Sequence, residues 1–499
     1  MFSLKDFVPR AYQENIVQRC KEKNVLVVMP TGVGKTGISM MVALDRLNKF
    51  PDSKVVICSP TKPLCQQHVK TFIEHTDIGS GRIILYTGNM QPEIRKKFWN
   101  LAKVIVATPQ TIQSDIENKR VTFDDVALLV IDEAHRSRMR FANTVIARMY
   151  MESSSPMKHI LALTASPGHT KEKVKEICEN LFIEDVEIRT EDDEDVKEYI
   201  QKREYEVLEV EFPKELQGIH AILKEVAHEK VRALSKVGFN KPVSIVSKKD
   251  LLLLQKRLQQ EIRMKKPSAF FGLSLVAQAL KVDYAMELLE TQGVEQSLQY
   301  LSQLEFESSK AAKAICSDER IKNVRGRLES FVQSGQVHPK VAKLKEILIE
   351  VFARNKNARA IVFANYRATV ESLRNVASTI PYVVPVVLMG QKGGVTQKHQ
   401  LETLEKFEAG KYNVLLATSI GEEGLSIGGL DVAIFYDHVA SAIRRIQRSG
   451  RVARVKPGRI IYVITKNTRD AAFFWKSRRD ENTMVSVMQN MKQSLLERS

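Results

Sequence analysis

A glycine-rich turn behind an apolar strand restricts what this chain can fold into more than any other stretch. Residues 25–35 read VLVVMPTGVGK, a β-branched run that breaks into a turn and continues as a helical pattern. Because Gly32 and Gly34 carry no Cβ, backbone amides there can close around an anion at the helix start. The pattern predicts a phosphate-binding loop in which Lys35 reaches the β- and γ-phosphates and the Thr36 hydroxyl binds Mg²⁺. An ordinary glycine turn after a buried strand is the plainer alternative.

A second apolar strand carries two acids at its end. Residues 126–131 (VALLVI) are followed directly by Asp132 and Glu133, then Ala134 and His135. Ligand sites of α/β proteins lie at such carboxyl ends of strands. One carboxylate can hold the Mg²⁺ shell while the next polarises a water molecule. Alone the pair would suggest a solvated turn, but together with the glycine loop it predicts a nucleotide site.

Composition predicts a multi-domain protein with a polyanionic partner. The 499 residues leave room for two or three domains, and 43% apolar residues exclude a largely disordered chain. The formal net charge is +17 and the pI is about 9.4. Such a cationic surface is most simply explained by binding to nucleic acid, with adaptation for solubility as the alternative.

The cysteines and the hydropathy pattern predict a soluble protein of a reducing compartment. Five cysteines form no CxxC pair and leave one over, so we expect neither structural zinc nor a disulfide framework. No apolar run approaches the ~18–20 residues that a membrane span needs. We therefore expect a cytoplasmic location without membrane contact, or association with the nucleoid in a prokaryote.

Alternating apolar runs and helical stretches predict two parallel-sheet domains, an α/β fold. We expect a first domain over 1–200, with strands near 55–58, 83–86, 104–107, 128–131 and 160–163, and a second over 339–499, with strands near 360–364, 384–389, 414–417, 432–436 and 460–464. Residues 201–338 carry long helical patterns and predict an α-helical insertion domain. The acidic segment 185–199 is interpreted as a solvated connector, and the amphipathic tail 469–499 as a helix that packs on a domain.

Basic residues gather in two further places. Residues 443–454 read IRRIQRSGRVAR, which places Gln447, Arg451 and Arg454 three or four apart, so that arginines can reach across a cleft to a γ-phosphate. The insertion concentrates cations that either grip a duplex or solubilise a helix bundle. These are Lys241, Lys248, Lys249, Lys256, Arg257, Arg263, Lys265 and Lys266.

Taken in order, these motifs resemble the superfamily 2 helicases. The resemblance is to the branch containing the archaeal Hef helicase and the Fanconi anaemia M protein, and more distantly the RIG-I and Dicer ATPases. It covers nearly the whole chain and is carried by residues 30–36, 59–64, 108–110, 132–135, 164–166, 362–367, 417–425 and 447–454. It implies two RecA-like domains with the helical insertion, similar to a thumb used on branched DNA, between them.

The resemblance also implies a role for each matching position. Gln13 would contact adenine with Arg10 beside it, Glu133 would activate the attacking water, and Arg451 and Arg454 would be arginine fingers with Gln447 near the γ-phosphate. ATP would be bound by Arg10, Gln13, Thr31, Gly32, Val33, Gly34, Lys35, Thr36 and Gly424, and Mg²⁺ by Thr36 and Asp132. Lys35, Asp132 and Glu133 would take part in catalysis. The nucleic-acid backbone would contact Thr61, Thr87, Gly88, Thr108, Asn365, Arg367, Gln391 and Thr418.

Three positions depart from the family pattern. Met29 replaces a small residue of other P-loops, which the Hef branch tolerates. Ser426 stands where the family usually has Asp, which puts one ribose or arginine-orienting contact in question. Val452 and Ala453 replace the usual Thr-Gly between the two arginines, so the local turn differs. Hef also carries a C-terminal nuclease, for which this chain has no matching acidic cluster, so a separate nuclease or clamp protein is the further partner we expect.

The expected function is that of an ATP-dependent DNA helicase or translocase on forked or branched DNA. One alternative is an ATPase of the RIG-I or Dicer type that double-stranded RNA stimulates. DEAH rather than DECH at 132–135 counts against it. Another is a nucleic-acid-binding scaffold with an impaired ATP site, for which Ser426 and Val452 are the hints. ATPase rates with forked DNA and with duplex RNA discriminate among the three.

Overall fold

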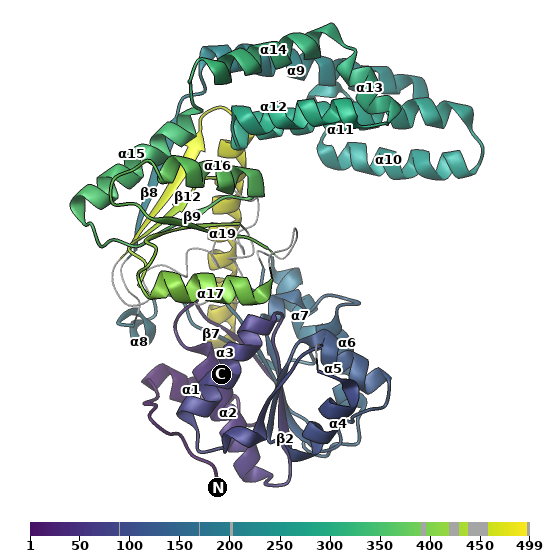
Figure 1. The fold of residues 1–499 in the computed structure, drawn as a ribbon. Helices are drawn as coiled ribbons and strands as arrows, with labels where there is room; N and C mark the ends of the chain where they lie inside the picture. Colours follow the sequence, from purple (N-terminus) through teal and green to yellow (C-terminus); the bar gives the residue numbers. More distant parts are fainter. Residues whose placement is uncertain are drawn as a thin grey trace.

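The protein contains two separate parallel sheets and a helical arm that projects from the second of them (Figure 1). The structure, a computed structural model, describes residues 1–88, 90–168, 170–199, 203–390, 396–418, 429–437 and 458–496. The predicted fold class, two parallel-sheet domains with an α-helical insertion, is confirmed. None of the helices in these ranges is long and apolar enough to cross a lipid bilayer.

The first sheet has seven parallel strands in the order β3-β4-β2-β5-β6-β1-β7. Its central strands are short β-branched runs that are buried along their whole length, because helices cover both faces. The strands are β1 (Val25–Val28), β2 (Lys54–Cys58), β3 (Ile83–Tyr86), β4 (Val104–Ala107), β5 (Val126–Asp132), β6 (Ile160–Thr164) and β7 (Asp185–Ile188). The helices are α1 (Ala11–Arg19), α2 (Lys35–Lys49), α3 (Lys62–His75), α4 (Pro92–Leu101), α5 (Pro109–Glu117), α6 (Ala142–Glu152), α7 (Lys171–Asn180) and α8 (Glu194–Lys197), with short 3₁₀ turns η1 (Ser80–Arg82) and η2 (Ala134–Arg136).

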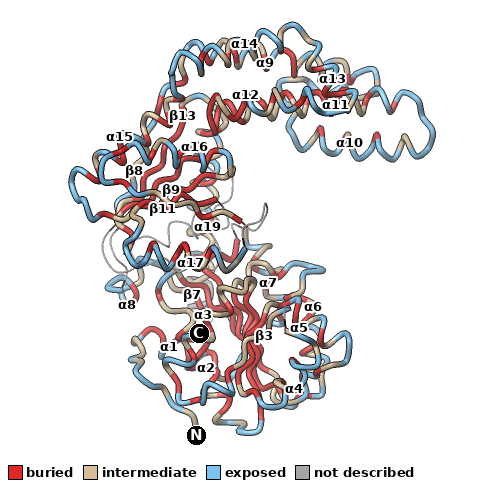
Figure 2. Tube along the Cα trace, viewed as in Figure 1, coloured by how far each residue is buried: buried red, intermediate tan, exposed pale blue. Residues whose placement is uncertain are grey.

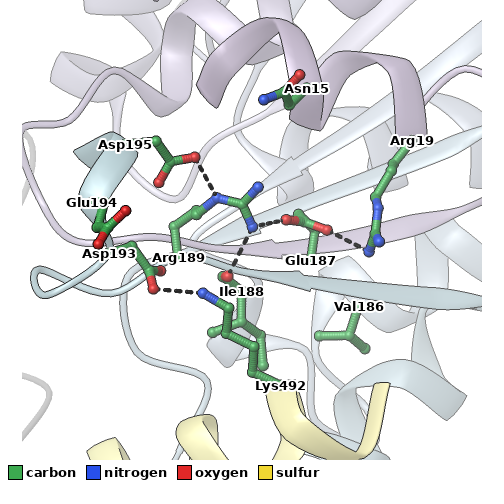
Figure 3. A pocket seen from close by; sticks show the side chains of 10 residues that line it. All are labelled: Asn15, Arg19, Val186, Glu187, Ile188, Arg189, Asp193, Glu194, Asp195 and Lys492. Atoms are coloured by element: carbon green, nitrogen blue, oxygen red, sulfur yellow. Dashed lines mark hydrogen bonds and ion pairs between the residues drawn. The ribbon is translucent and has the colours of Figure 1, made fainter. Parts of the chain in front are cut away.

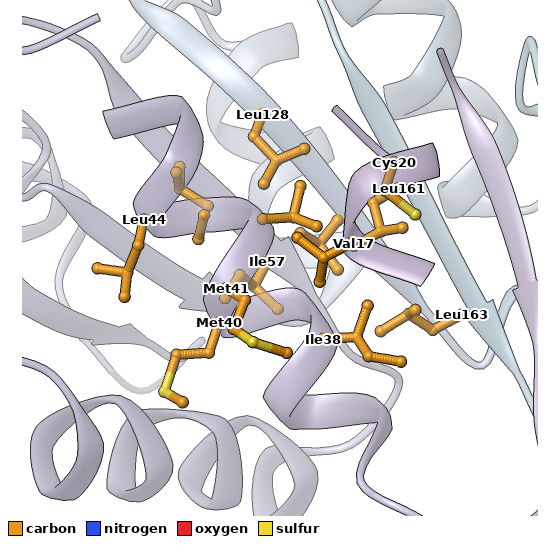
Figure 4. Packing of buried hydrophobic residues seen from close by; sticks show 14 of the residues in the cluster. Val17, Cys20, Ile38, Met40, Met41, Leu44, Ile57, Leu128, Leu161 and Leu163 are labelled. Atoms are coloured by element: carbon orange, nitrogen blue, oxygen red, sulfur yellow. The ribbon is translucent and has the colours of Figure 1, made fainter. Parts of the chain in front are cut away.

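Helix α2 fills the centre of one face of this sheet (Figure 4). Its Ile38, Met41 and Leu44 pack together with side chains of α1 and of the central strands, among them Val17 and Leu161. Each such fully buried aliphatic side chain contributes about 1.5–3 kcal/mol to folding. The core therefore fixes the start of α2, and with it the glycine loop, against β1.

The acidic segment 185–199 is only partly the solvated connector that its charge suggested. Asp185–Ile188 form β7, which pairs in parallel with β1 from Val25↔Asp185 to Val28↔Ile188. Glu187 is buried on this edge strand because Arg19 and Arg189 both pair with its carboxylate. Paired cations offset the cost of burying the acid, which charge counting along the sequence did not reveal.

The second sheet has six parallel strands in the order β10-β11-β9-β12-β13-β8. Its strands are β8 (Arg203–Val210), β9 (Ala360–Phe363), β10 (Pro385–Leu388), β11 (Val414–Ala417), β12 (Val432–Phe435) and β13 (Gly458–Thr465), and its helices are α15 (Pro339–Arg354), α16 (Arg367–Ala377) and α17 (Gln397–Glu408). Residues 203–210, which the sequence analysis placed in the helical insertion, instead form the edge strand β8 beside β13. Their alternation of charged and apolar residues suits an edge strand with one solvated face.

The insertion is an all-helical arm that carries its own core. It comprises α9 (Lys214–Ala233), α10 (Lys248–Arg263), α11 (Pro267–Thr291), α12 (Val294–Gln303), α13 (Lys310–Cys316) and α14 (Glu319–Gln333), with 3₁₀ turns η3 (Leu234–Val237), η4 (Val243–Ile245) and η5 (Leu304–Phe306). Figure 2 shows that the buried residues of the arm line its inside, while the central strands of both sheets are buried.

A buried polar joint fixes the arm to the second sheet. Nζ of Lys340 lies 2.8 Å from Oδ2 of Asp470 with both side chains 0% exposed, and it also donates to the carbonyl of Thr291 at 3.3 Å. Next to it Gln292 accepts from the Thr369 hydroxyl at 2.8 Å. Because an uncompensated buried charge is costly, these paired groups hold the end of α11 in one position.

The last helix, α19 (Arg469–Leu496), joins the two sheet domains. It begins against the second sheet, where Phe474 packs in the core, and runs down to the first, where Met484 and Met488 enter the other core (Figure 1). Lys492 donates to Asp193 of the first domain at 2.5 Å. The tail thus packs on a domain as its sequence suggested, and it packs on both.

Candidate nucleotide site and nucleic-acid edge

The glycine loop leads directly into the start of α2. Gly32 and Gly34 have φ of +85° and +86°, the left-handed region that favours glycine. No side chain caps the helix at Gly34, so amides of its first turn point out with the positive end of the helix dipole behind them. This is the local geometry that binds phosphate.

Helix α1 supports the loop from behind. The Tyr12 hydroxyl donates to the carbonyl of Val33 at 2.5 Å, and Nε2 of Gln13 donates to the carbonyl of Gly34 at 3.2 Å. Oε1 of Gln13 accepts from the backbone amide of Arg10 at 3.0 Å. Gln13 is thus engaged with the loop itself, and its contact with adenine stays a prediction.

Lys35 is folded back over the loop. Its Nζ donates to the carbonyls of Met29 and Pro30, at 3.1 and 2.9 Å. These two neutral acceptors hold the ammonium where a phosphate would enter, and an anion is the stronger partner for it. Lys35 and the loop amides therefore form one anion site.

Asp132 lies opposite the loop at the end of β5. In the sheet only β6 separates β5 from β1, so the acid and the glycine loop leave strand ends that lie two positions apart. Its Oδ2 accepts from the Ser59 hydroxyl and contacts Nε2 of His68, both at 3.0 Å. Burial raises the pKa of Asp132, but the His68 hydrogen bond, the charges of His68 and Lys35 and the Ser59 bond hold that pKa below its ordinary value. Asp132 is therefore ionised at neutral pH.

Glu133 sits in a left-handed backbone conformation, with φ of +52°, which is uncommon for a residue with a Cβ. Its Oε2 receives no hydrogen bond within the described part of the chain and lies 3.3 Å from Nδ1 of His135. The same Nδ1 lies 3.2 Å from the Thr164 hydroxyl at the end of β6. A buried carboxylate oxygen with a free lone pair next to an anion site is suited to accept a proton from water.

These residues fit a nucleotide with its divalent cation. The loop cradle leaves no room for a Cβ at Gly34, since one would lie 2.5 Å from Nε2 of Gln13. Thr36 and Asp132 supply the hydroxyl and ionised carboxylate oxygens that Mg²⁺ prefers. Among the described residues no group of three or more His, Cys, Asp and Glu side chains is arranged to hold a metal by itself, so phosphate oxygens and water would complete the coordination.

Next to the loop, the guanidinium of Arg10 stacks on the ring of Tyr199 at 4.3 Å and donates to the Tyr12 hydroxyl at 3.0 Å. Stacking and a hydrogen bond together fix the arginine at the entrance to the site. Arg10 thus lies next to Tyr12, which itself bonds the loop, while its predicted position beside a base stays a prediction.

Two cavities flank the site. One of about 460 Å³ lies between α1, β7, α8 and α19 (Figure 3). Its cations are paired: Arg189 with Glu187 and Asp195, and Lys492 with Asp193. We therefore interpret this cavity as part of the ion-paired contact between α19 and the first domain, and not as the nucleotide site. The other, of about 230 Å³, lies between residues 28–31 of the loop and the Met484 face of α19.

The predicted nucleic-acid residues of the first domain share one edge of its sheet. Thr61 follows β2, Thr87 and Gly88 follow β3, and Thr108 follows β4, and these three strands are neighbours. Thr61 occupies the N-cap position of α3 without a capping hydrogen bond, and its buried hydroxyl has no hydrogen-bond partner among the described residues. The structure thus brings these four residues together at the carboxyl end of the sheet, where hydroxyls and amides can meet phosphodiesters.

In the second domain Asn365 and Arg367 follow β9, and Thr418 follows the adjacent β11. Asn365 donates its backbone amide to Asp437 at 2.7 Å, and Thr418 is buried, with its amide bound to the carbonyl of Leu388 at 3.1 Å. Their contacts with nucleic acid stay predictions. Outside the described residues lie Gln391, Gly424, Gln447, Arg451 and Arg454, and with them the departures at Ser426, Val452 and Ala453.

Three side chains of the site were not among the predicted site residues. Tyr12 binds the loop, and Ser59 and His68 bind Asp132. Along the sequence Tyr12 is only an aromatic residue ahead of the first strand, and His68 is only a histidine between two strands. Their role depends on contacts between segments more than sixty residues apart, or in the case of Tyr12 about twenty, which spacing along the chain does not encode.

A P-loop domain, a second parallel-sheet domain without a P-loop and a helical arm inserted into that second domain define the motor core of a helicase. The DEAD/DEAH box helicase family matches residues 10–174, and the helicase conserved C-terminal domain matches 339–456. A helical bundle described as that of a putative ATP-dependent RNA helicase matches 215–334.

The chain belongs to the Hef family of helicases. It is 40% identical to the Hef helicase domain of Pyrococcus furiosus, whose crystal structure superposes with a TM-score of 0.73 over 94% of this chain and 98% of that chain. It is 36% identical to a putative ATP-dependent RNA helicase of Methanocaldococcus jannaschii, over 98% of this chain and 61% of the relative. It is 32% identical to an ATP-dependent DNA helicase of Schizosaccharomyces pombe, over 94% of this chain and 58% of the relative. The chain thus spans about six-tenths of the length of these two curated relatives.

Proposed function

We propose that this chain is an ATP-dependent DNA helicase or translocase that acts on forked or branched DNA. The observation that carries the proposal is the position of Glu133 directly after Asp132: its buried Oε2 receives no hydrogen bond within the described residues and lies 3.3 Å from Nδ1 of His135. The family relationship, the net charge of +17 and the hydroxyl-bearing strand ends of the first sheet support nucleic acid as the substrate. The relative from Schizosaccharomyces pombe, named a DNA helicase, supports DNA.

In the proposed mechanism the triphosphate lies on the amides of the α2 start. Lys35 exchanges the Met29 and Pro30 carbonyls for phosphate oxygens. Thr36 and Asp132 would hold Mg²⁺, which would supply neutralisation of the phosphate charge when bound. Glu133 then accepts a proton from the attacking water while the adjacent His135 fixes its orientation.

Motion would follow from closure of the two sheet domains. In the proposal Gln447, Arg451 and Arg454 complete the site from the second domain only when the domains are closed, as the resemblance implies. Thr61 and Thr108 hold the strand in one state and Asn365 and Arg367 in the next. Backbone contacts of this kind give little base specificity, which suits a translocase.

The test of the site is the Glu133→Gln variant. The amide cannot accept the proton, so ATP turnover with forked DNA should fall at least about 100-fold, while binding of a fluorescent ATP analogue stays within about twofold. Glu152→Gln, an exposed Glu at the end of α6, is the matched control and should leave both unchanged. Fork unwinding by Glu133→Gln at the wild-type rate would overturn the assignment of the proton acceptor.

The substrate is tested by ATP hydrolysis and strand separation on single-stranded, duplex, forked and four-way junction DNA. The proposal expects the forked and branched substrates to stimulate both most strongly. An ATPase that no nucleic acid stimulates would instead favour the binding scaffold with an impaired site.

A double-stranded RNA-stimulated ATPase is the second candidate. It is favoured by one finding, the match of residues 215–334 to the helical bundle of a putative RNA helicase. ATPase rates with forked DNA and duplex RNA of equal length separate the two. Higher stimulation by the RNA would replace the DNA proposal.

A further inference from the structure

A buried histidine contacts the carboxylate that we expect to bind Mg²⁺. His68 lies on the inner face of α3, between Cys65 and Phe72 at the spacing of one helix face. Both of these neighbours are fully buried members of the apolar core, and His68 itself is 3% exposed. An apolar side chain would suit this position. A polar ring there needs a partner that offsets the cost of its burial.

Within the described residues, the one hydrogen-bond partner of this ring is Asp132. Nε2 of His68 lies 3.0 Å from Oδ2 of Asp132, and the buried Nδ1 has no partner in the described part of the chain. An ionised carboxylate can only accept hydrogen bonds, so Nε2 carries the proton and donates it. A buried histidine that served packing alone would normally satisfy both of its ring nitrogens. This single polar contact therefore indicates a role at the carboxylate.

The Ser59 hydroxyl binds the same oxygen of Asp132. Ser59 follows β2 directly, is fully buried, and donates to Oδ2 at 3.0 Å. Two bonds hold its backbone in place. The Ser59 amide donates to the carbonyl of Ala107 at 3.0 Å, and its carbonyl accepts from the Cys65 thiol at 3.5 Å. Both donors to Oδ2 thus come from elements that are fixed by the core of the first domain.

These contacts make the two oxygens of Asp132 unequal. A carboxylate oxygen has two lone pairs, and the bonds from Ser59 and His68 use both lone pairs of Oδ2. Oδ1 accepts one bond, from the backbone amide of Glu133 at 2.9 Å. One lone pair of Oδ1 is therefore left over by the described residues. Asp132 can offer a cation this one oxygen, directly or through water, but not both oxygens at once.

We propose that His68, together with Ser59, makes Asp132 a one-oxygen ligand and thereby sets the preference of the nucleotide site for Mg²⁺ over Ca²⁺. This inference rests on the proposed function. Mg²⁺ requires near-ideal octahedral geometry and keeps several of its waters, whereas Ca²⁺ accepts more oxygens and often takes both oxygens of one carboxylate. His68 is a positioning residue, because it acts on the cation through Asp132.

Burial makes this arrangement costly to change. Asp132 is 8% exposed, so little water is available to replace a lost hydrogen bond, and bonds to an ionised acceptor are stronger than neutral ones. Turning the carboxylate to give both oxygens to one cation would break the bonds from His68 and Ser59. It would leave a ring N–H and a hydroxyl buried without a partner. This cost opposes two-oxygen binding of Ca²⁺ and does not affect one-oxygen binding of Mg²⁺.

The test measures the affinity for ADP by isothermal titration with excess Mg²⁺, with excess Ca²⁺ and with the chelator EDTA. The gain in affinity over EDTA reports how well each cation is held, and it should be larger with Mg²⁺ in wild type. His68→Leu removes the donor at similar side-chain size, so Asp132 can turn. The Mg²⁺ gain should then fall at least about tenfold, while the Ca²⁺ gain stays within about twofold because two-oxygen binding becomes possible. The affinity in EDTA should not change.

Three further variants separate positioning from folding. His68→Gln keeps an N–H donor and should retain the wild-type cation preference within about twofold. Ser59→Ala frees the same oxygen at the loss of one atom, so it should shift the preference toward Ca²⁺ even if His68→Leu does not fold. His159→Leu is the matched control, because His159 is equally buried in the same domain but binds the Cys20 carbonyl, at 2.7 Å. Its melting temperature should fall while its cation preference stays that of wild type.

Two results would overturn the inference and leave the helicase proposal standing. One is an equal gain from the two cations in wild type, or an unchanged preference in both His68→Leu and Ser59→Ala. The other is a loss of ADP affinity in His68→Leu that is as large in EDTA as in Mg²⁺, since the histidine would then only support the fold of the site. The proposed function is tested separately, by wild-type ATP hydrolysis with DNA, and it fails if no DNA stimulates that hydrolysis.

Discussion

Arg95 on α4 and Asp115 on α5 form a buried bidentate ion pair: Nε to Oδ2 and Nη2 to Oδ1 are both 2.6 Å. Arg95 also donates to the carbonyl of Met90, and its own carbonyl accepts from the Tyr86 hydroxyl. The hydrogen bond to Asp115 raises the pKa of Arg95, outweighing the effect of burial. The pair thus ties the turn after β3 to the helix that follows Thr108.

The Arg95–Asp115 ion pair should be essential to the stability of the first domain. Arg95→Met leaves a buried, largely unpaired carboxylate, so we expect the free energy of unfolding to fall by about 3–5 kcal/mol in urea titrations. The double variant Arg95→Met/Asp115→Leu should recover part of that loss. Arg120→Met, which removes only the more exposed partner of Asp115, is the control and should cost about 1 kcal/mol or less. A double variant no more stable than the single one would argue against the pairing.

The two loop glycines should differ in their tolerance of alanine. Both have positive φ, but a Cβ on Gly34 would lie 2.5 Å from Nε2 of Gln13, whereas one on Gly32 meets nothing within 4 Å. Gly32→Ala should therefore show only backbone strain, about 1–2 kcal/mol. Gly34→Ala should in addition displace Gln13 and weaken ATP binding by more than tenfold. Isothermal titration of both variants with an ATP analogue checks this, and equal affinities would contradict it.

The methionines of α19 should contribute to the stability of the first domain. Met484 and Met488 are buried in its core. Met484→Ala should therefore lower the free energy of unfolding by about 2–5 kcal/mol. Lys492→Ala, which removes a partly exposed ion pair with Asp193 on the same helix, should cost about 1 kcal/mol or less. Hydrogen exchange measures the protection of the backbone amides of the first domain. If this protection is the same in Met484→Ala as in wild type, α19 does not stabilise the first domain.

Stability should fall as the pH drops below about 6.5. Burial, followed by the charge of Arg46, lowers the pKa of His159 from 6.5 to about 4, although its contact with the Cys20 carbonyl opposes the shift. Between these values the unfolded chain binds the extra proton, so stability is present above pH 6.5 and is lost toward pH 4, by up to about 1.4 kcal/mol per pH unit. Burial likewise lowers the pKa of His338, to about 3, which adds a similar loss.

His159→Gln tests this dependence, because the amide keeps a donor for Cys20 but does not titrate in this range. Melting temperatures at pH 7 and pH 5 should differ less in this variant than in wild type, with the remaining difference due in part to His338. If the melting temperatures at pH 7 and pH 5 differ as much in the variant as in wild type, His159 does not contribute to the pH dependence of stability.

Much of the fold follows from local signals in the sequence. The apolar runs ending at Val28 and Ile131 are short and contain β-branched residues, a pattern that favours buried strands, and the glycines at 32 and 34 adopt the left-handed backbone of a turn. The edge strands β7 and β8 were missed because their charges suggest solvent exposure. In β7 the burial of Glu187 is tolerable because Arg19 of α1 and the nearby Arg189 both pair with it. The support of Asp132 by His68 was missed because these two residues lie 64 positions apart in the sequence.

Helix α19 limits how the two halves of this motor can move. From Phe474 to Met484 it covers ten residues, about 15 Å of continuous helix, and an α-helix hardly stretches. The two domains are therefore linked by a rigid helix and not by a flexible segment. A change in the angle between the two domains must either rotate them about α19 or withdraw Met484 and Met488 from the core of the first domain. The packing of these two side chains would therefore limit how far the domains can rotate relative to one another.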